Sequence, residues 1–191
     1  MDKTSKYAVF GSGSWATAIV KMLCENLDEV GWYMRSVYTK EHILKELHNP
    51  SYLSSVEFHT EQLKLSNDIN EIADWADVLI FVIPSAFIHT ELQKLTVDIS
   101  HKVVVSAVKG IIPETGLLVG EHFHDHYNIS FENIGVIAGP CHAEEVALER
   151  LSYLTISCAD ATKAQAIADV LSSDYIKTKI SDDIIGTEYA V

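Results

Sequence analysis

Short apolar runs alternate along this chain with segments that have helical spacing. The apolar run Tyr7–Phe10 predicts a strand, and the apolar positions between residues 15 and 23 predict a helix after it. Residues 77–83 form the strongest predicted strand, because a continuous apolar run ending at Pro84 is typical of a central parallel strand covered on both faces. The other predicted strands are 29–34, 63–65, 102–108, 134–138, 153–157 and 175–180, and the other predicted helices are 38–47, 68–75, 87–95, 116–126, 143–148, 161–171 and a last one from residue 182.

This regular alternation predicts the α/β fold class. We expect a Rossmann-like, doubly wound, mostly parallel sheet with helices on both faces. Because no repeat or linker divides the chain, residues 1–191 are expected to form one domain. Ligands of such sheets bind at the carboxyl ends of the strands, so candidate functional residues are sought there.

Composition narrows the class of protein. Hydrophobic residues make up 48% of the 191 residues, which is ample for a buried core. The formal net charge of −13 argues against a nucleic-acid or anionic-membrane surface. No apolar run reaches membrane-spanning length, no signal peptide begins the chain, and the 3 cysteines are widely spaced. We therefore expect a cytoplasmic protein without disulfides or membrane insertion.

The turn after the first predicted strand carries a glycine pattern at residues 11–16. Gly11 permits a tight turn, Gly13 permits a pyrophosphate to approach the backbone, and Ala16 permits close packing of the helix on the strand. The helix N-terminus then presents free N–H groups and the positive end of its dipole to the phosphates. The pattern predicts a dinucleotide-binding domain with NAD or NADP as cofactor, although a lone glycine pattern has low specificity.

Two further strand ends bear on the cofactor. An acidic residue about twenty positions after the glycines would bind the adenosine ribose and repel a 2′-phosphate. This chain has Arg35 beside Ser36 instead, which either grips a 2′-phosphate by charge-assisted bonds or is a solvated surface arginine. The first alternative predicts use of NADP or of both cofactors. Phe87, close after Pro84, either packs against the nicotinamide side of the dinucleotide or belongs to the core.

Two later strand ends offer polar groups to the same crevice. Lys109 follows an apolar strand and precedes a glycine, so its ammonium either binds a phosphate or carbonyl oxygen or leaves the strand for solvent. Gly139 begins a turn into another helix N-terminus, which is a second candidate anion site. Cys141 has no triad partner fixed by spacing and is interpreted as lining a pocket. Glu144 and Glu145 in the first helical turn also suit the helix dipole.

The histidines at residues 122, 124 and 126 resemble a metal site at first sight. Alternate positions share a face only on a strand, however, and this segment is predicted to end a helix. No second group of ligands has zinc-like spacing. We therefore expect no metal.

Together these segments resemble the N-terminal domain of bacterial-type NAD(P)-dependent glycerol-3-phosphate dehydrogenase. The resemblance covers nearly the whole chain and is carried, in order, by residues 11–15, 49–53, 83–85, 108–111, 139–147 and 182–188. It implies hydride transfer from NAD(P)H to the ketone carbon of dihydroxyacetone phosphate, giving sn-glycerol 3-phosphate for phospholipid synthesis. The implied partner is a small phosphate ester and not a nucleic acid.

The resemblance also implies roles for individual residues. Lys109 would touch both cofactor and substrate, and its charge would favour the alkoxide that develops during hydride transfer. Gly139 and Cys141 would lie beside the substrate. With the glycine turn and Phe87 added, the expected cofactor-binding set is Gly11, Gly13, Ser14, Trp15, Arg35, Phe87, Lys109 and Ala143.

The chain departs from the family in three places. Ala16 stands where the family usually has a third glycine, which the pattern tolerates, and Cys141 stands where it usually has a serine or similar residue. The family continues into a helical C-terminal domain, which begins with an Ala-Leu-Lys-Asn-like segment whose lysine is taken as the proton donor. We therefore expect the general-acid lysine beyond Val191, no certain catalytic residue within the chain, little turnover from it alone, and a homodimer in the full-length enzyme.

Two other functions stay open at this point. A related dehydrogenase of 3-hydroxy acids or 6-phosphogluconate would have a similar N-terminal sheet. A stand-alone module that senses NAD(P)H without chemistry would have the same cofactor site. A lysine–asparagine pair shortly after codon 191, followed by a helical domain, would favour the glycerol-3-phosphate enzyme.

Overall fold

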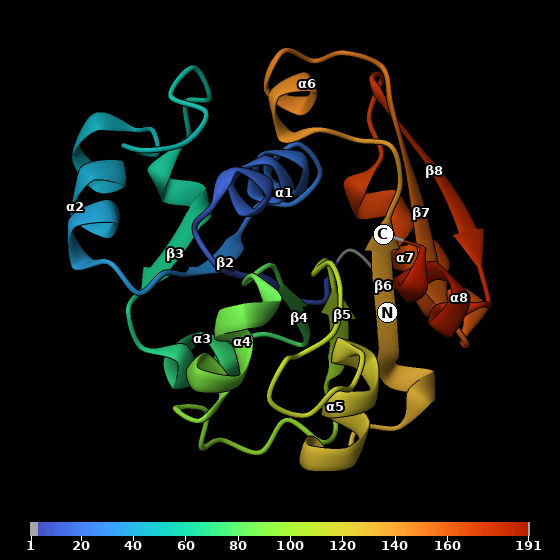
Figure 1. Cartoon of the computed structure of the whole chain (residues 1–191). Helices are drawn as coiled ribbons and strands as arrows, with labels where there is room; N and C mark the ends of the chain where they lie inside the picture. The colour runs from blue at the N-terminus through green and yellow to red at the C-terminus, as the bar shows by residue number, and fades with distance from the viewer. Residues whose placement is uncertain (1–3, 191) are drawn as a thin grey trace.

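The predicted strands assemble into a single sheet in the computed structural model, which describes residues 4–190 (Figure 1). The eight strands lie in the order β3-β2-β1-β4-β5-β6-β7-β8. Their bounds are β1 Tyr7–Phe10, β2 Val30–Tyr33, β3 Leu63–Ser66, β4 Val78–Phe81, β5 Val103–Ser106, β6 Ile134–Ala138, β7 Ser152–Cys158 and β8 Ile176–Ser181.

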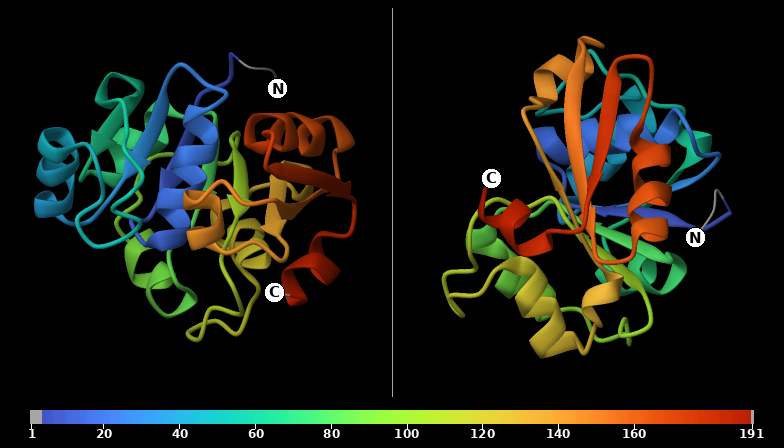
Figure 2. Two further views of the ribbon diagram at one scale, coloured as in Figure 1. Left: turned by 90° about the horizontal axis from the view of Figure 1, so that it is seen from above. Right: turned by 90° about the vertical axis from the view of Figure 1, so that its right-hand side faces the viewer.

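Helices cover both faces of this sheet. They are α1 Ser14–Cys24, α2 Val37–Glu46, α3 Ile69–Trp75, α4 Ser85–Leu92, α5 Val119–Tyr127, α6 Ala143–Ala147, α7 Ala161–Leu171 and α8 Ile184–Tyr189, with short 3-10 turns η1 Thr60–Gln62 and η2 Phe131–Asn133. Helices α1 and α6 lie over one face, whereas α3, α4 and α5 lie against the other (Figure 1). Figure 2 shows α7 and α8 on opposite sides of β7. The arrangement confirms the predicted fold class.

Coverage on both faces explains the continuous apolar runs. All four residues of β1 are buried, and successive residues of that strand belong to different core clusters. Val9 packs in the cluster that includes α1 and α7 residues, whereas Phe10 packs in the cluster that includes α3, α4 and α5 residues. Side chains alternate between the faces of a strand, so both sets of positions have to be apolar.

The strand order creates a crevice at the carboxyl ends of β1 and β4. The chain steps from β1 to β2 and β3 on one side and then crosses back to β4, β5 and β6 on the other. In the parallel registers, Phe10 lies level with Tyr33 of β2 and with Phe81 of β4. The turns that follow these three residues therefore meet at one edge, which is the place where such sheets bind ligands.

One strand runs against the others. β7 pairs antiparallel with β6, with Ile137 opposite Ile156, whereas β8 pairs parallel with β7. The segment between β6 and β7 holds only the five-residue α6, which packs on α1 and does not cross the sheet. The chain therefore returns from the carboxyl end of β6, and the next strand has to run in the opposite direction.

The observed boundaries differ slightly from the predicted ones. β4 ends at Phe81, two residues before the end of its apolar run, and Val82 and Ile83 are buried beyond it. Pro84 is the N-cap of α4, so this helix begins at Ser85 and not at Phe87. None of the helices in residues 4–190 combines the length and apolar character that a bilayer-spanning helix needs.

Candidate functional site

Gly11 makes the sharp turn at the end of β1. Its φ of +133° is a conformation that residues with a side chain rarely adopt, and a Cβ there would lie 2.8 Å from the Val82 carbonyl oxygen. The Gly11 amide donates to the Tyr33 carbonyl (3.1 Å), and its own carbonyl accepts from the Trp32 indole (2.6 Å). The glycine pattern predicts the tight turn at Gly11, and the structure shows that this turn is held between β2 and the residue that follows β4.

Gly13 leaves open space in front of helix α1. It is the N-cap of this helix, and a Cβ on it would meet no atom within 4 Å. The first N–H groups of the helix, beginning at Ser14 and Trp15, have no acceptor within the helix. A pyrophosphate fits this combination of open space, unpaired donors and positive helix dipole.

Asn49 braces the glycine turn from a loop far along the chain. This buried side chain donates to the Ser12 carbonyl (3.1 Å) and to the Thr17 hydroxyl (2.9 Å). Its own oxygen accepts from the backbone amide of Tyr52 (3.2 Å), whose ring lines the cavity beside the glycine turn. In the sequence, Asn49 stands out only as the first residue of the segment 49–53 that carries the family resemblance. Its structural role is visible only because the fold brings the loop to α1.

A cavity of about 240 Å³ joins the glycine turn to Arg35. The Arg35 guanidinium lies over the Phe87 ring, with its central carbon 5.9 Å from the ring centroid. Phe87 is 54% exposed, so it is not a core residue. The cavity is lined by Gly11, Ser12, Gly13, Tyr33, Arg35, Tyr52, Val82, Ile83, Pro84 and Phe87.

The structure bears on the two alternatives that the sequence leaves open for Phe87. Its exposure excludes the core, and its contact with the nicotinamide side of a dinucleotide stays a prediction. The structure places it beside Arg35, and it lines neither of the cavities that contain Lys109. The reason is that α4 begins at Ser85, directly after its N-cap Pro84, so its first turn faces β2 across the end of β1.

A buried carboxylate lies beneath Arg35. Glu91 of α4 accepts a hydrogen bond from the Tyr33 hydroxyl and one from the Lys94 ammonium (2.9 Å), and lies 3.8 Å from the Arg35 Nε. Burial and the hydrogen bond with Glu91 raise the pKa of the Tyr33 hydroxyl, so it remains protonated and donates. The sequence gives no sign of this contact, because Glu91 lies 58 residues from Tyr33.

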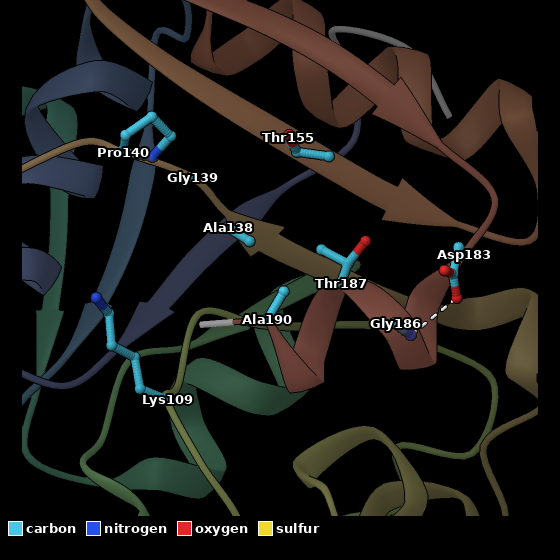
Figure 3. Close-up of a pocket in the computed structure, with 9 residues that line it drawn as sticks. All are labelled: Lys109, Ala138, Gly139, Pro140, Thr155, Asp183, Gly186, Thr187 and Ala190. Carbon is cyan, nitrogen blue, oxygen red and sulfur yellow. Dashed lines mark hydrogen bonds between the residues drawn. The ribbon is translucent and has the colours of Figure 1, made fainter.

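A larger cavity, of about 590 Å³, lies at the carboxyl ends of β5 and β6 (Figure 3). Lys109 stands on one side of it and Asp183 on the other. The lining residues are Lys109, Ala138, Gly139, Pro140, Thr155, Asp183, Gly186, Thr187 and Ala190. A narrow space of about 20 Å³ connects Lys109 and Gly139 with Trp15 and Cys141. The fold therefore brings together four residues that sequence reasoning selected separately.

Lys109 is exposed at this site. Within residues 4–190 its ammonium has no salt-bridge or hydrogen-bond partner, so its charge is available to a ligand. Gly139 has a structural requirement of its own, since its φ is +136° and a Cβ would lie 2.6 Å from the Tyr153 carbonyl oxygen. The presence of glycine at 139 therefore does not by itself indicate a ligand contact.

The residues after Gly139 are poorly suited to nucleophilic catalysis or to anion binding. Burial raises the pKa of the half-buried Cys141 thiol, which disfavours the thiolate and agrees with a pocket-lining role. Ala143 is buried at the start of α6. This helix has five residues, which leaves little dipole to attract an anion.

The histidine cluster lies on the other side of the sheet from α1. The rings of His122 and His126 are 4.4 Å apart, and that of His89 lies 5.9 Å from His122. Burial, together with these two neighbours, lowers the pKa of His122 to about 4. Across residues 4–190 no three His, Cys, Asp or Glu side chains are arranged to hold a metal ion.

Comparison with known proteins places the chain among dehydrogenase domains. The sequence profile of the family described as NAD-dependent glycerol-3-phosphate dehydrogenase N-terminus matches residues 6–164. The chain is 32% identical over 184 residues to the glycerol-3-phosphate dehydrogenase (NAD(P)+) of an Exiguobacterium species, covering 95% of this chain and 54% of that protein. It is 33% identical over 186 residues to the enzyme of that name from Oceanobacillus iheyensis, covering 96% of this chain and 53% of that protein.

Solved structures agree with this placement. Glycerol-3-phosphate dehydrogenase of Plasmodium falciparum superposes with a TM-score of 0.84 at 25% identity, covering 96% of this chain and 54% of that one. The fold alone is shared with glycerol-3-phosphate dehydrogenase of Coxiella burnetii, with a TM-score of 0.85 at 22% identity and coverage of 97% and 56%. The chain spans about half the length of the curated relatives it matches.

Proposed function

Since this chain belongs to the family of NAD-dependent glycerol-3-phosphate dehydrogenase N-terminal domains, we propose that it forms the cofactor-binding part of an enzyme that interconverts dihydroxyacetone phosphate and sn-glycerol 3-phosphate. Residues 1–191 are the dinucleotide-binding domain in this proposal. A helical domain supplies the rest of the substrate site, in keeping with relatives about twice as long. Free cysteines and the net charge of −13 support a cytoplasmic enzyme that binds a small phosphate ester and not nucleic acid, with a homodimer as the proposed assembly.

The arrangement of cavities supports a defined course for NAD(P)H. The adenosine lies in the cavity of Arg35, Tyr52 and Phe87. The pyrophosphate lies over Gly13 at the start of α1, where its negative charge meets the unpaired N–H groups of Ser14 and Trp15. The nicotinamide end points toward Lys109. The observation that carries this proposal is that the glycine turn opens between the cavity of Arg35 and the space shared by Trp15 and Lys109.

Lys109 is the residue we assign to the reacting carbonyl. The bound dinucleotide supplies the hydride for reduction of the ketone carbon. The unpaired Lys109 ammonium attracts the ketone oxygen and stabilises the negative charge that develops on it. Gly139 and Cys141 line the space beside Lys109, and Ala143 follows them at the start of α6. The proton for the alkoxide comes in this proposal from a lysine of the following domain.

Titration with NADH and NADPH tests the cofactor site directly. Trp15 lies in the site, so quenching of tryptophan fluorescence reports binding. Gly13→Val is the informative variant, because Gly13 has an ordinary φ of −76° and a Cβ there meets nothing in the protein. The added side chain fills the space assigned to the pyrophosphate. We expect at least about tenfold weaker binding of both dinucleotides, with a loss of stability of only about 1 kcal/mol because valine is a poorer N-cap than glycine.

The control is Gly116→Ala, where a Cβ also meets no atom within 4 Å but the residue lies before α5, outside the glycine turn and away from Lys109. This variant should bind NADH as the wild type does. Equal affinity of the Gly13→Val variant and the wild type would show that the pyrophosphate does not lie over this turn. Absence of binding of either dinucleotide to the wild type would contradict the proposed function.

A further inference from the structure

A second cavity adjoins the one at the glycine turn and shares Tyr33 and Arg35 with it. It measures about 250 Å³ and is lined by Tyr33, Arg35, Asn67, Asp68, Ile69, Asn70 and Lys94. It lies beyond the carboxyl end of β2, with Arg35 between it and the glycine turn. Two cations, Arg35 and Lys94, therefore face one space next to the proposed adenosine position. A phosphate monoester is the ligand chemistry that suits two such cations.

Glu91 stands directly behind both cations. Its side chain is only 2% exposed, although glutamate is rarely buried without charged partners. The Lys94 ammonium contacts its Oε1 at 2.9 Å, and the Arg35 Nε lies 3.8 Å from its Oε2. Two carboxylates thus offset part of the charge that the cavity presents to an anion. Asp68 lines the cavity and caps α3 by accepting from the Asn70 amide, whereas Glu91 lies buried behind the two cations.

The proposed function places the 2′ position of the adenosine ribose at the second cavity, beside Arg35 and Lys94. NADP carries a phosphate there and NAD carries a hydroxyl. We infer that Glu91 is a specificity-determining residue whose carboxylate weakens binding of the 2′-phosphate by Arg35 and Lys94, and so keeps NADH competitive with NADPH. This inference rests on the proposed function.

The geometry indicates that the charge of Glu91 matters more than its contact with Arg35. The Arg35 side chain is 63% exposed, and a contact of 3.8 Å at such a site contributes little to its position. The Phe87 ring supports the guanidinium independently. The buried carboxylate, in contrast, is poorly screened by solvent and repels a phosphate through the protein interior. Removing the charge should therefore strengthen binding of a 2′-phosphate.

Glu91→Gln separates charge from shape. The hydrogen bonds from the Tyr33 hydroxyl and from Lys94 both reach Oε1, so a glutamine carbonyl at that position keeps them. Only the Oε2 that faces Arg35 becomes an amide nitrogen. We expect the Kd for NADPH to fall about tenfold while the Kd for NADH changes less than about twofold. The measurement is fluorescence titration with NADH and NADPH at one ionic strength.

Two further variants complete the test. Glu132→Gln makes the same change in net charge at the exposed turn η2 before β6, away from the cavity, and should alter neither affinity. Lys94→Gln removes a cation whose side chain is 53% exposed, so it should fold normally and weaken NADPH binding several-fold with little effect on NADH. It keeps the inference testable if the Glu91→Gln variant does not fold.

The outcomes distinguish this inference from the proposed function. Tighter NADPH binding by the Glu91→Gln variant, with weaker NADPH binding by the Lys94→Gln variant, would support the role of Glu91. Suppose instead that the wild type binds both dinucleotides and the folded variants have the same ratio of NADPH Kd to NADH Kd as the wild type. Glu91 then does not determine specificity, although the proposed cofactor site is correct. If the wild type binds neither dinucleotide, the proposed function itself fails.

Discussion

The two cationic residues at the strand ends differ in how far their charge is neutralised by neighbouring carboxylates. Arg35 and Lys109 both follow buried apolar strands and look equivalent in the sequence. Arg35 lies over the buried Glu91 carboxylate, whereas Lys109 has no salt-bridge partner within residues 4–190. The free ammonium suits the proposed stabilisation of an alkoxide, and the partly neutralised guanidinium suits discrimination between two cofactors.

His122 makes stability depend on pH. Its imidazole is buried, its Nδ1 has no hydrogen-bond partner, and its pKa falls from 6.5 to about 4. The rings of His126 and His89 disfavour the charged form, and Asp125 only partly offsets them. Between these two pKa values the folded state binds fewer protons than the unfolded state, so stability falls as pH decreases through this window. From pH 7 to pH 5 the loss from His122 is about 2 kcal/mol.

Urea unfolding at pH 7 and pH 5 measures this loss. His122→Phe removes the titrating group and keeps an aromatic ring beside Phe123 and Tyr127. The difference in unfolding free energy between the two pH values should shrink by about 2 kcal/mol in this variant. His101→Asn, at an exposed histidine, should leave the difference unchanged. An unaltered pH dependence in the His122→Phe variant would show that another group carries it.

At the scale of elements, the antiparallel strand β7 determines how close the chain comes to Gly139. The β6 turn runs against the backbone of β7, where a Cβ on Gly139 would lie 2.6 Å from the Tyr153 carbonyl oxygen. Gly139→Ala should therefore cost about 3 kcal/mol, from backbone strain at positive φ together with steric overlap. The measurement is the unfolding free energy in urea.

Gly110→Ala is the matched control for this prediction. Gly110 also has a positive φ, of +80°, but no atom lies within 4 Å of its Cβ position. Its substitution should cost only the backbone strain, about 1 kcal/mol. Equal losses in the two variants would mean that the approach of β7 does not constrain Gly139.

At the scale of the whole molecule, the two core clusters share one sheet. Successive residues of each central strand contribute to opposite clusters, so neither cluster can unfold while the other keeps its strands. We expect a single cooperative transition, with tryptophan fluorescence and far-ultraviolet circular dichroism giving the same midpoint. Distinct midpoints for the two probes would show that the helical layers unfold separately.

Cofactor binding should stabilise the whole molecule in the same experiment. At a concentration of NADH one hundred times its Kd, the folded state gains about 2.7 kcal/mol. For a protein of this size that gain corresponds to a rise in melting temperature of roughly 5–10 °C. At the same NADH concentration a tenfold higher Kd leaves a gain of about 1.4 kcal/mol, so the Gly13→Val variant should show about half of this rise or less.

The amino-acid pattern was sufficient for those features that depend on neighbouring residues. Each predicted strand and helix has a counterpart in the structure within a few residues. Continuous apolar runs reveal burial on both faces, and glycine followed by helical spacing reveals the turn at Gly11 and Gly13. Such patterns arise from local geometry, so they are readable in one sequence without its partners.

The tertiary structure alone decided the features that join distant segments. The pattern does not contain the reversed direction of β7, which follows from α6 failing to cross the sheet. It does not place Phe87 beside Arg35, Asn49 behind the glycine turn, or Glu91 beneath Arg35. These contacts join residues on different elements, and which elements become neighbours depends on strand order and strand direction. Hydrophobic periodicity specifies which side of an element is buried but not which element it packs against. For this reason the sequence determined the candidate strand ends, and only the fold determined the site that they form together.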